Sequence, residues 1–168
     1  MTASAVIRHG PKAGIARDTL PGSLQMVVGF DGSAPAVRAL DAAARLIRGR
    51  TGFIHIVYVA RMPAPTAVSA DAYSELADVF DEKERKLALE SRQHLMGTEE
   101  RWSFQRRSGD VVAELIEAAR QLSKAKPGRR DHDTMIVVGA STRSVHRRVG
   151  SVPVALVRRT DVQLLVVP

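Results

Sequence analysis

The stretch QMVVGFDGSAPAVRAL, residues 25–40, carries the clearest structural pattern in the chain. An apolar run leads into Asp31-Gly32-Ser33, and an alanine-rich amphipathic segment follows. A continuous apolar run is typical of a strand that is covered on both faces of a sheet. Ser33 is a residue type that caps helices, because its hydroxyl accepts a backbone N–H group that the first turn leaves unpaired. The stretch therefore predicts a strand, a tight turn and a helix.

Strand and helix patterns alternate along the rest of the chain as well. Apolar or alternating segments predict four more strands, over residues 53–60, 101–107, 134–140 and 161–168. Apolar residues at helical spacing predict helices after Ser33, over about 69–96, after Asp110 and over 152–160. The connections are long enough for parallel crossovers, which place helices on both faces of a sheet. The order predicts an α/β fold with one open five-stranded parallel sheet.

Composition agrees with one soluble domain. The 168 residues are 45% hydrophobic and 26% charged, with a net charge of +7 and no cysteine, which excludes disulfides and thiolate metal sites. No apolar run approaches the roughly 18 residues that cross a membrane, and residues 1–22 lack the apolar centre of a secretory signal. We expect a flexible N-terminal tail over 1–22, a domain over 23–168, a cytoplasmic location and no membrane association.

Two loops have features of a ligand site. Ligands of an open parallel sheet bind at the carboxyl ends of the strands, where the strand order reverses. The loops that follow the first and fourth strands are DGS, 31–33, and GASTRSVHRRVGS, 139–151. The second loop combines hydroxyls and arginines with Gly150-Ser151 at the start of a helix, where free N–H groups and the helix dipole favour an anion.

Each loop also has a purely structural interpretation. Asp31 is a common turn residue, and Ser151 could simply cap a helix in a polar connection. The second loop matches neither G-x-x-x-x-G-K-[ST] nor G-x-G-x-x-G, so it supports no P-loop or Rossmann mechanism. The five histidines are scattered without metal-ligand spacing on one element. We therefore expect no metal site and no catalytic residue, with a phosphate-type ligand left open.

Four segments together resemble the universal stress protein family over residues 24–168: VVGFDGSAPAVRALDAAA, IHIVYVA, SGDVVAELIEAA and IVVGASTRSVHRRVGSVPVALVRRTDVQLLVVP. With the strands numbered along the chain, the resemblance implies the sheet order 3-2-1-4-5. It also implies an adenine nucleotide, ATP or cyclic AMP, between the first and fourth strands, with Mg²⁺ only if ATP is bound. Asp31 would contact the ribose, the backbone of Val59 the adenine, and the 139–151 loop the phosphates. The candidate cofactor-binding residues are Asp31, Gly32, Ser33, Val59, Gly139, Ser141, Thr142, Arg143, Gly150, Ser151 and Val152.

The phosphate loop departs from the family motif G-x2-G-x9-G-[ST]. Thr142 stands where the motif has its second glycine, and the stretch from Gly139 to Gly150 is about two residues shorter. A shorter loop without that glycine offers fewer close approaches of backbone to a triphosphate. The arginines could compensate by charge, or the chain could belong to the members that hold no ATP.

The last strand indicates a contact between copies of the chain. VQLLVVP, residues 162–168, would lie at a sheet edge with no charge to discourage pairing. Family members often dimerise through this strand, so the resemblance implies a homodimer through 162–167.

These observations favour a cytoplasmic stress-response or signalling module that binds an adenine nucleotide. The alternative is a dimeric stress protein that binds no nucleotide and acts through an unidentified protein partner. The loop 139–151 holds no carboxylate to orient water or magnesium, so we expect at most slow nucleotide hydrolysis. Binding of nucleic acid through the arginine clusters would be purely electrostatic, and we expect no such partner.

Overall fold

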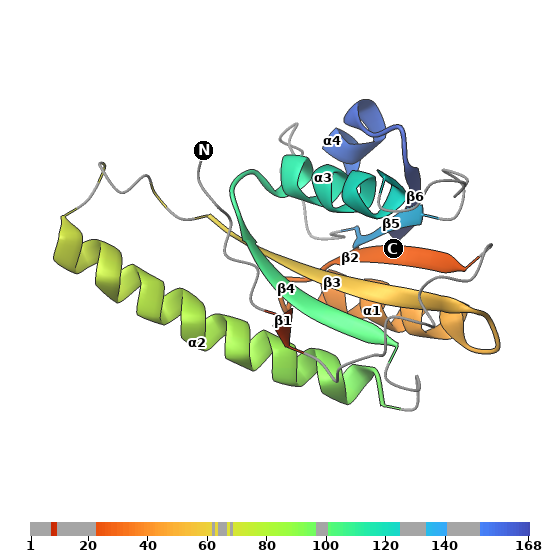
Figure 1. Cartoon of the computed structure of the whole chain (residues 1–168), viewed down its shortest axis with the longest axis horizontal. Helices are drawn as coiled ribbons and strands as arrows, with labels where there is room; N and C mark the ends of the chain where they lie inside the picture. Colours follow the sequence, from red (N-terminus) through yellow and green to blue (C-terminus); the bar gives the residue numbers. More distant parts are fainter. Residues whose placement is uncertain are drawn as a thin grey trace.

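Helices flank both faces of an open, twisted sheet in the computed structural model of the chain (Figure 1). The structure describes residues 8–9, 23–61, 63, 67, 69–96, 101–124, 134–140 and 152–168. Within these residues the strands are β1 (Arg8–His9), β2 (Leu24–Gly29), β3 (Gly52–Ala60), β4 (Trp102–Ser108), β5 (Thr134–Gly139) and β6 (Gln163–Val167). The helices there are α1 (Ala34–Ile47), α2 (Ala70–His94), α3 (Val111–Lys124) and α4 (Val152–Arg159).

The predicted sheet topology is confirmed. The strand order is β1-β4-β3-β2-β5-β6, and all pairs from β4 to β6 are parallel. Numbering these five parallel strands along the chain gives the order 3-2-1-4-5. The order reverses between β2 and β5, because the chain first adds strands on one side of β2 and then on the other. This reversal places the carboxyl ends of β2 and β5 at a crevice.

One strand lies outside the prediction. Arg8 and His9 form β1, which pairs antiparallel with β4 at the register Arg8↔Gln105 and His9↔Phe104. Part of the N-terminal segment therefore extends the sheet. The remainder of 1–22 lies outside the described residues, so the flexibility of this segment stays a prediction.

The core on one face of the sheet lies under α1 and α2. The buried face of α1 consists mainly of alanines, together with Leu40 and Ile47, and small side chains let a helix lie close to a sheet. Strand residues Met26, Ile54 and Phe104 pack against it. The longer α2 buries only Glu84, Leu87 and Ser91, and its first half extends past the sheet in Figure 1.

The opposite face is covered by α3 and α4 (Figure 1). Its core combines β-branched strand residues with Leu115 and Ile116 of α3 and Leu156 of α4. The strand residues there are Val27, Val57, Ile136 and Val138. Because consecutive strand residues point to opposite faces and both faces are covered, β2, β3 and β5 are mostly apolar, with Gln25, His55 and Thr134 as polar exceptions.

Local caps determine where the helices begin. Ser33 caps α1, as predicted, with its hydroxyl accepting the Ala36 N–H at 3.4 Å. Asp110 accepts the Ala113 N–H at 3.0 Å and so caps α3. The α2 helix is unbroken from Ala70 to His94. None of the helices in the described segments is long and apolar enough to cross a membrane.

Candidate functional site

A cavity of about 610 Å³ opens at the carboxyl ends of β2, β3 and β5. Helices α1, α3 and α4 all begin at its wall, and the middle of α2 covers one side. It lies at the reversal of strand order, where the sequence predicts a ligand. Its lining residues are Gly29, Phe30, Asp31, Ser33, Pro35, Ala36, Val57, Tyr58, Val59, Arg61, Phe80, Lys83, Val111, Leu115, Val138, Gly139, Val152 and Pro153.

The structure brings several predicted site residues together at this cavity. The predicted residues in its wall are Asp31, Ser33, Val59, Gly139 and Val152. Gly32 lies in the adjoining turn rather than among the lining residues. Ser141, Thr142, Arg143, Gly150 and Ser151 lie outside the described residues. The role of each residue as a ligand contact stays a prediction.

Asp31 forms the turn between β2 and α1 and also lines the cavity. Its Oδ1 accepts the Ser33 backbone N–H at 2.9 Å, which is an Asx-turn contact. Gly32 completes the turn at a φ of +80°, and a Cβ there would come 2.7 Å from Leu87 Cδ2. The structural and functional interpretations of Asp31 are therefore compatible, since the turn occupies only one of two carboxylate oxygens.

Gly139 is required by packing, independently of any ligand. A Cβ at this position would overlap the carbonyl group of Pro35 and lie 2.7 Å from the Pro35 Cβ. The end of β5 thus rests directly on the first turn of α1. This contact holds β2, α1 and β5 together at the cavity wall.

Tyr58 and Lys83 form the part of the wall that lies between β3 and α2. Tyr58 is 3% exposed, and the Lys83 Nζ lies 5.5 Å from the centroid of its ring, within cation–π range. Burial raises the pKa of the Tyr58 hydroxyl; Arg106 opposes this effect, and Glu84 and Asp31 add to it. The wall is therefore a neutral phenol ring beneath an ammonium group.

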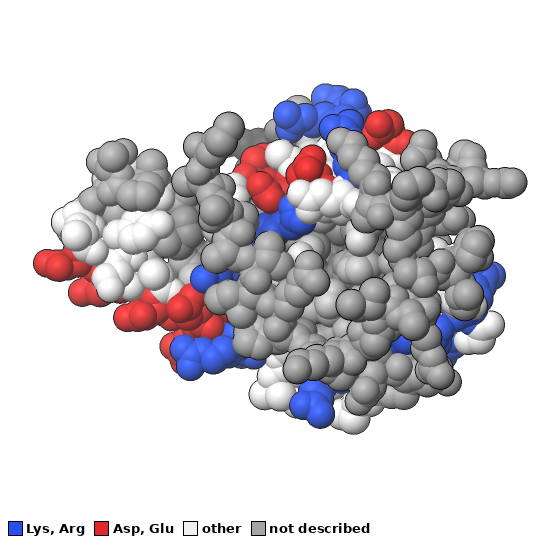
Figure 2. Space-filling model, viewed as in Figure 1, with Lys and Arg blue, Asp and Glu red and all other residues white. Residues whose placement is uncertain are grey.

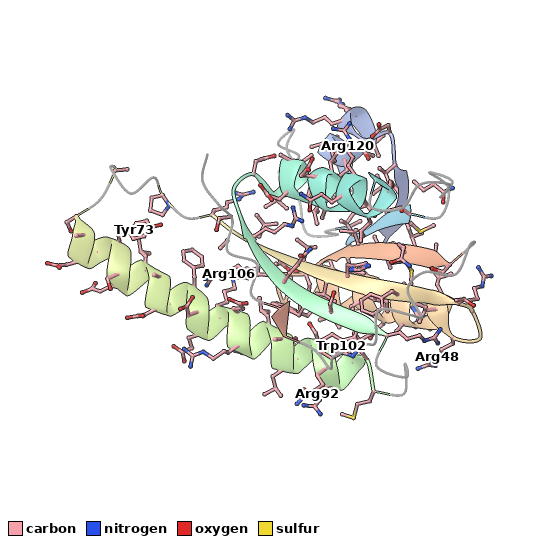
Figure 3. The ribbon with its side chains drawn as sticks, viewed as in Figure 1. Arg48, Tyr73, Arg92, Trp102, Arg106 and Arg120 are labelled. Atoms are coloured by element: carbon pink, nitrogen blue, oxygen red, sulfur yellow. The ribbon has the colours of Figure 1, made fainter. Side chains whose placement is uncertain are left out.

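An ion-pair cluster lies next to Tyr58, because Arg106 is its neighbour on β4. Arg106 Nη1 contacts Asp81 Oδ1 and lies 3.3 Å from Glu84 Oε2, and Figure 3 shows Arg106 between β4 and α2. Glu84 is 2% exposed, so its charge needs a close cation. The cluster ties α2 to β4.

The charges of the cavity wall are few. Arg61 and Lys83 are its cations in the described part of the chain, and Asp31 is its carboxylate. Most other lining residues are apolar. Among the described residues, no group of three or more Asp, Glu or His side chains is placed to hold a metal ion. Such a wall fits a ligand with an apolar body and a few polar groups.

A family model, described as the universal stress protein family, matches residues 24–168. The chain belongs to the universal stress protein family. No curated protein matches the sequence. Three solved universal stress proteins share the fold. One from Lactobacillus plantarum has 19% identity and a TM-score of 0.68, with 89% of this chain and 100% of that chain covered. One from Burkholderia pseudomallei has 22% identity and a TM-score of 0.64, covering 89% and 99%.

The third similar structure is a universal stress protein solved in complex with cAMP. It has 23% identity and a TM-score of 0.63, and the match covers 88% of this chain and 98% of that chain. At identities of 19–23%, the three structures show the fold of this universal stress protein.

Sequence reasoning missed the α2 side of the cavity in this universal stress protein. Phe80 and Lys83 of α2 line the wall, together with Arg61 just after β3. A connection that contains prolines separates β3 from α2. The sequence does not indicate where such a connection places the helix. Tyr58 is adjacent to the predicted Val59, and strand alternation directs its side chain to the other sheet face. An aromatic residue at the end of a predicted strand was the one available signal.

Proposed function

We propose that this universal stress protein binds an adenine nucleotide, ATP or cyclic AMP, in the cavity between β2 and β5. It would act in the cytoplasm as a stress-response or signalling module. The observation that carries the proposal is the convergence of Asp31, Val59, Gly139 and Val152 on one cavity at the reversal of strand order. A protein of the same fold was solved in complex with cAMP, which supports the choice of ligand class.

The chemistry of the wall suits such a ligand. The base would lie against apolar side chains near Val57 and Val59, and the ribose hydroxyls would donate to the Asp31 oxygen that the turn does not use. The phosphates would be attracted by Lys83 and Arg61 and by the first turns of the helices that begin at the wall. Mg²⁺ would enter only with ATP, on the phosphates.

Calorimetric titration with ATP, ADP, AMP and cyclic AMP tests the proposal. We expect at least one of them to bind more tightly than millimolar. Failure of all four to do so would overturn the proposal, and the dimeric stress protein without a nucleotide would then be preferred.

Two substitutions of Asp31 separate its structural role from its binding role. Asp31→Asn keeps an oxygen that can accept the Ser33 N–H, whereas Asp31→Ala removes it. We expect Asp31→Asn to fold with nearly unchanged stability and to weaken nucleotide binding about tenfold, because one charge-assisted hydrogen bond is lost. Unchanged affinity in Asp31→Asn would leave Asp31 as a turn residue alone.

We also propose a homodimer through residues 162–167. The outer edge of β6 has no neighbour in the described sheet, and Val166 on β6 is 36% exposed. Val166→Lys would place a charge on this edge, which disfavours strand pairing. Sedimentation equilibrium should then show a monomer, whereas Val79→Lys, which charges an exposed valine of α2 away from β6, should leave the dimer intact. A Val166→Lys variant that stays a dimer would contradict the interface.

A further inference from the structure

Arg38 of α1 joins the ends of the last two strands. Its Nε donates to the main-chain oxygen of Pro168 at 2.6 Å, and its Nη2 donates to the Ala140 carbonyl at 3.4 Å. Between these two points, the Ala140 N–H donates to the Val167 carbonyl at 2.7 Å. One guanidinium group therefore holds together the residues at which β5 and β6 end.

These contacts lie directly beside the cavity. Gly139 lines the cavity and rests on Pro35, one turn before Arg38 on the same helix. Residues of β6 do not line the cavity, so the strand can communicate with it only through its neighbours. The path from β6 through Ala140 and Arg38 to α1 and Gly139 is short and contiguous.

The guanidinium group of Arg38 donates to these two main-chain oxygens. Asp41, three residues further along the helix, pairs with His94 at 3.0 Å. Carbonyls at the last rung of a parallel ladder have no further strand N–H to accept. Arg38 supplies the donors that the ladder lacks, and its fork geometry can serve two acceptors at once.

We propose that Arg38 is a positioning residue that couples β6 to the nucleotide cavity. The coupling rests on the proposed function and adds a regulatory link to it. Ligand that fixes the cavity wall at Gly139 stabilises the Ala140–Arg38–Pro168 contacts, and therefore β6. By reciprocity, whatever stabilises β6 strengthens ligand binding by the same factor.

Hydrogen exchange of the apo protein tests the clamp itself. We compare the wild type with Arg38→Met, Arg38→Lys and Arg45→Met, the last of which changes an exposed arginine two turns further along α1. Arg38→Met should speed exchange of both the Ala140 amide and the β6 amides about tenfold, since charge-assisted hydrogen bonds are lost. Arg38→Lys keeps the charge but lacks the planar fork that faces both oxygens, so it should give a smaller increase, and Arg45→Met should give none. Faster exchange at β6 with an unchanged Ala140 amide would overturn the clamp.

The same measurement with saturating nucleotide tests the coupling. In the wild type, nucleotide should slow exchange of the β6 amides about threefold or more, although β6 does not touch the cavity. In Arg38→Met this added protection should disappear while protection of the β2 amides at the cavity remains. Equal protection of β6 in both proteins would overturn the proposal. If the wild type binds no nucleotide at all, the proposed function and this coupling to it fail, and the apo comparison still decides whether the clamp exists.

Discussion

Gly139 is the residue that tolerates least change at the cavity. Alanine there would overlap the Pro35 carbonyl, and a backbone group of a packed helix cannot move aside as a flexible side chain can. We expect Gly139→Ala to lower the free energy of unfolding by about 3 kcal/mol, at the upper end of overpacking costs. Gly29→Ala is the matched control, because its Cβ would meet the Leu115 side chain at 3.1 Å, which can adjust. Urea denaturation of both variants checks this, and equal costs would contradict it.

Tyr58 gives the stability a specific pH dependence. Burial raises the pKa of Tyr58 above the 10.0 of a free tyrosine, so at high pH the unfolded chain releases its phenolic proton before the folded protein does. The contribution of Tyr58 to stability is therefore full below pH 10 and decreases as the pH rises above it. Urea denaturation at pH 8 and pH 10.5 should show a smaller loss of stability for Tyr58→Phe than for the wild type. Identical losses would contradict the raised pKa.

The residues of the site divide clearly into those that the sequence could predict and those that it could not. Asp31, Val59 and Gly139 lie at or just beyond the carboxyl ends of strands that are recognisable by their apolar runs, so the topology brings them together. Lys83 and Phe80 come from a helix whose rotation and position depend on the ion pairs of Arg106 with Asp81 and Glu84. Such pairs join residues about 25 positions apart along the chain and leave no local pattern.

Among the elements, α2 is held by ion pairs as well as by apolar packing. Its first half carries exposed acids, which Figure 2 shows in red at the left of the molecule, and Figure 3 shows Tyr73 on the part that extends past the sheet. Its attachment to β4 relies on Glu84 beneath Arg106. The sequence predicted this helix from its spacing but could not predict which of its charges are buried.

The Glu84–Arg106 pair can be tested by a double-mutant cycle. We expect Arg106→Met to cost about 3 kcal/mol of unfolding free energy, because it leaves the buried Glu84 carboxylate without this cation. Combining it with Glu84→Met should recover most of that loss, since an apolar pair needs no ionic partner. Denaturation by urea measures both, and strictly additive losses would contradict a coupled pair.

Lys83 is the cation of α2 in the cavity lining, so it tests how α2 contributes to the proposed nucleotide binding. Lys83→Met should weaken ATP binding about fivefold, with a smaller effect on AMP and none on adenosine, because an exposed cation acts on ligand charge. Lys86→Met, three residues further along and outside the cavity lining, is the matched control. Calorimetry at two salt concentrations measures the effect, and equal losses for ATP and adenosine would show that Lys83 does not act through charge.

At the scale of the whole molecule, the five parallel strands were predictable and β1 was not. Alternating strand and helix patterns restrict the topology to very few arrangements. Two residues, Arg8 and His9, carry no periodicity, and their pairing with β4 is set by the tertiary structure alone.

Removal of the N-terminal segment tests what β1 does. Deletion of residues 1–22 should expose the outer edge of β4 and produce species larger than those of the full chain, because uncovered strand edges pair with other chains. Deletion of residues 1–7 keeps Arg8–His9 and should leave the distribution unchanged. Sedimentation velocity distinguishes them, and identical distributions for all three proteins would contradict a protective role.

The position of β1 bears on how many copies of the chain could join edge to edge. A sheet with two uncovered edges is a bifunctional monomer, and pairing of unlike edges can add units without end. β1 covers part of the β4 edge, which leaves β6 as the reactive end within the described sheet. A monofunctional unit joins one like partner around a two-fold axis and then stops. If the proposed dimer forms through β6, the two residues of β1 would prevent further copies from adding at the β4 edge.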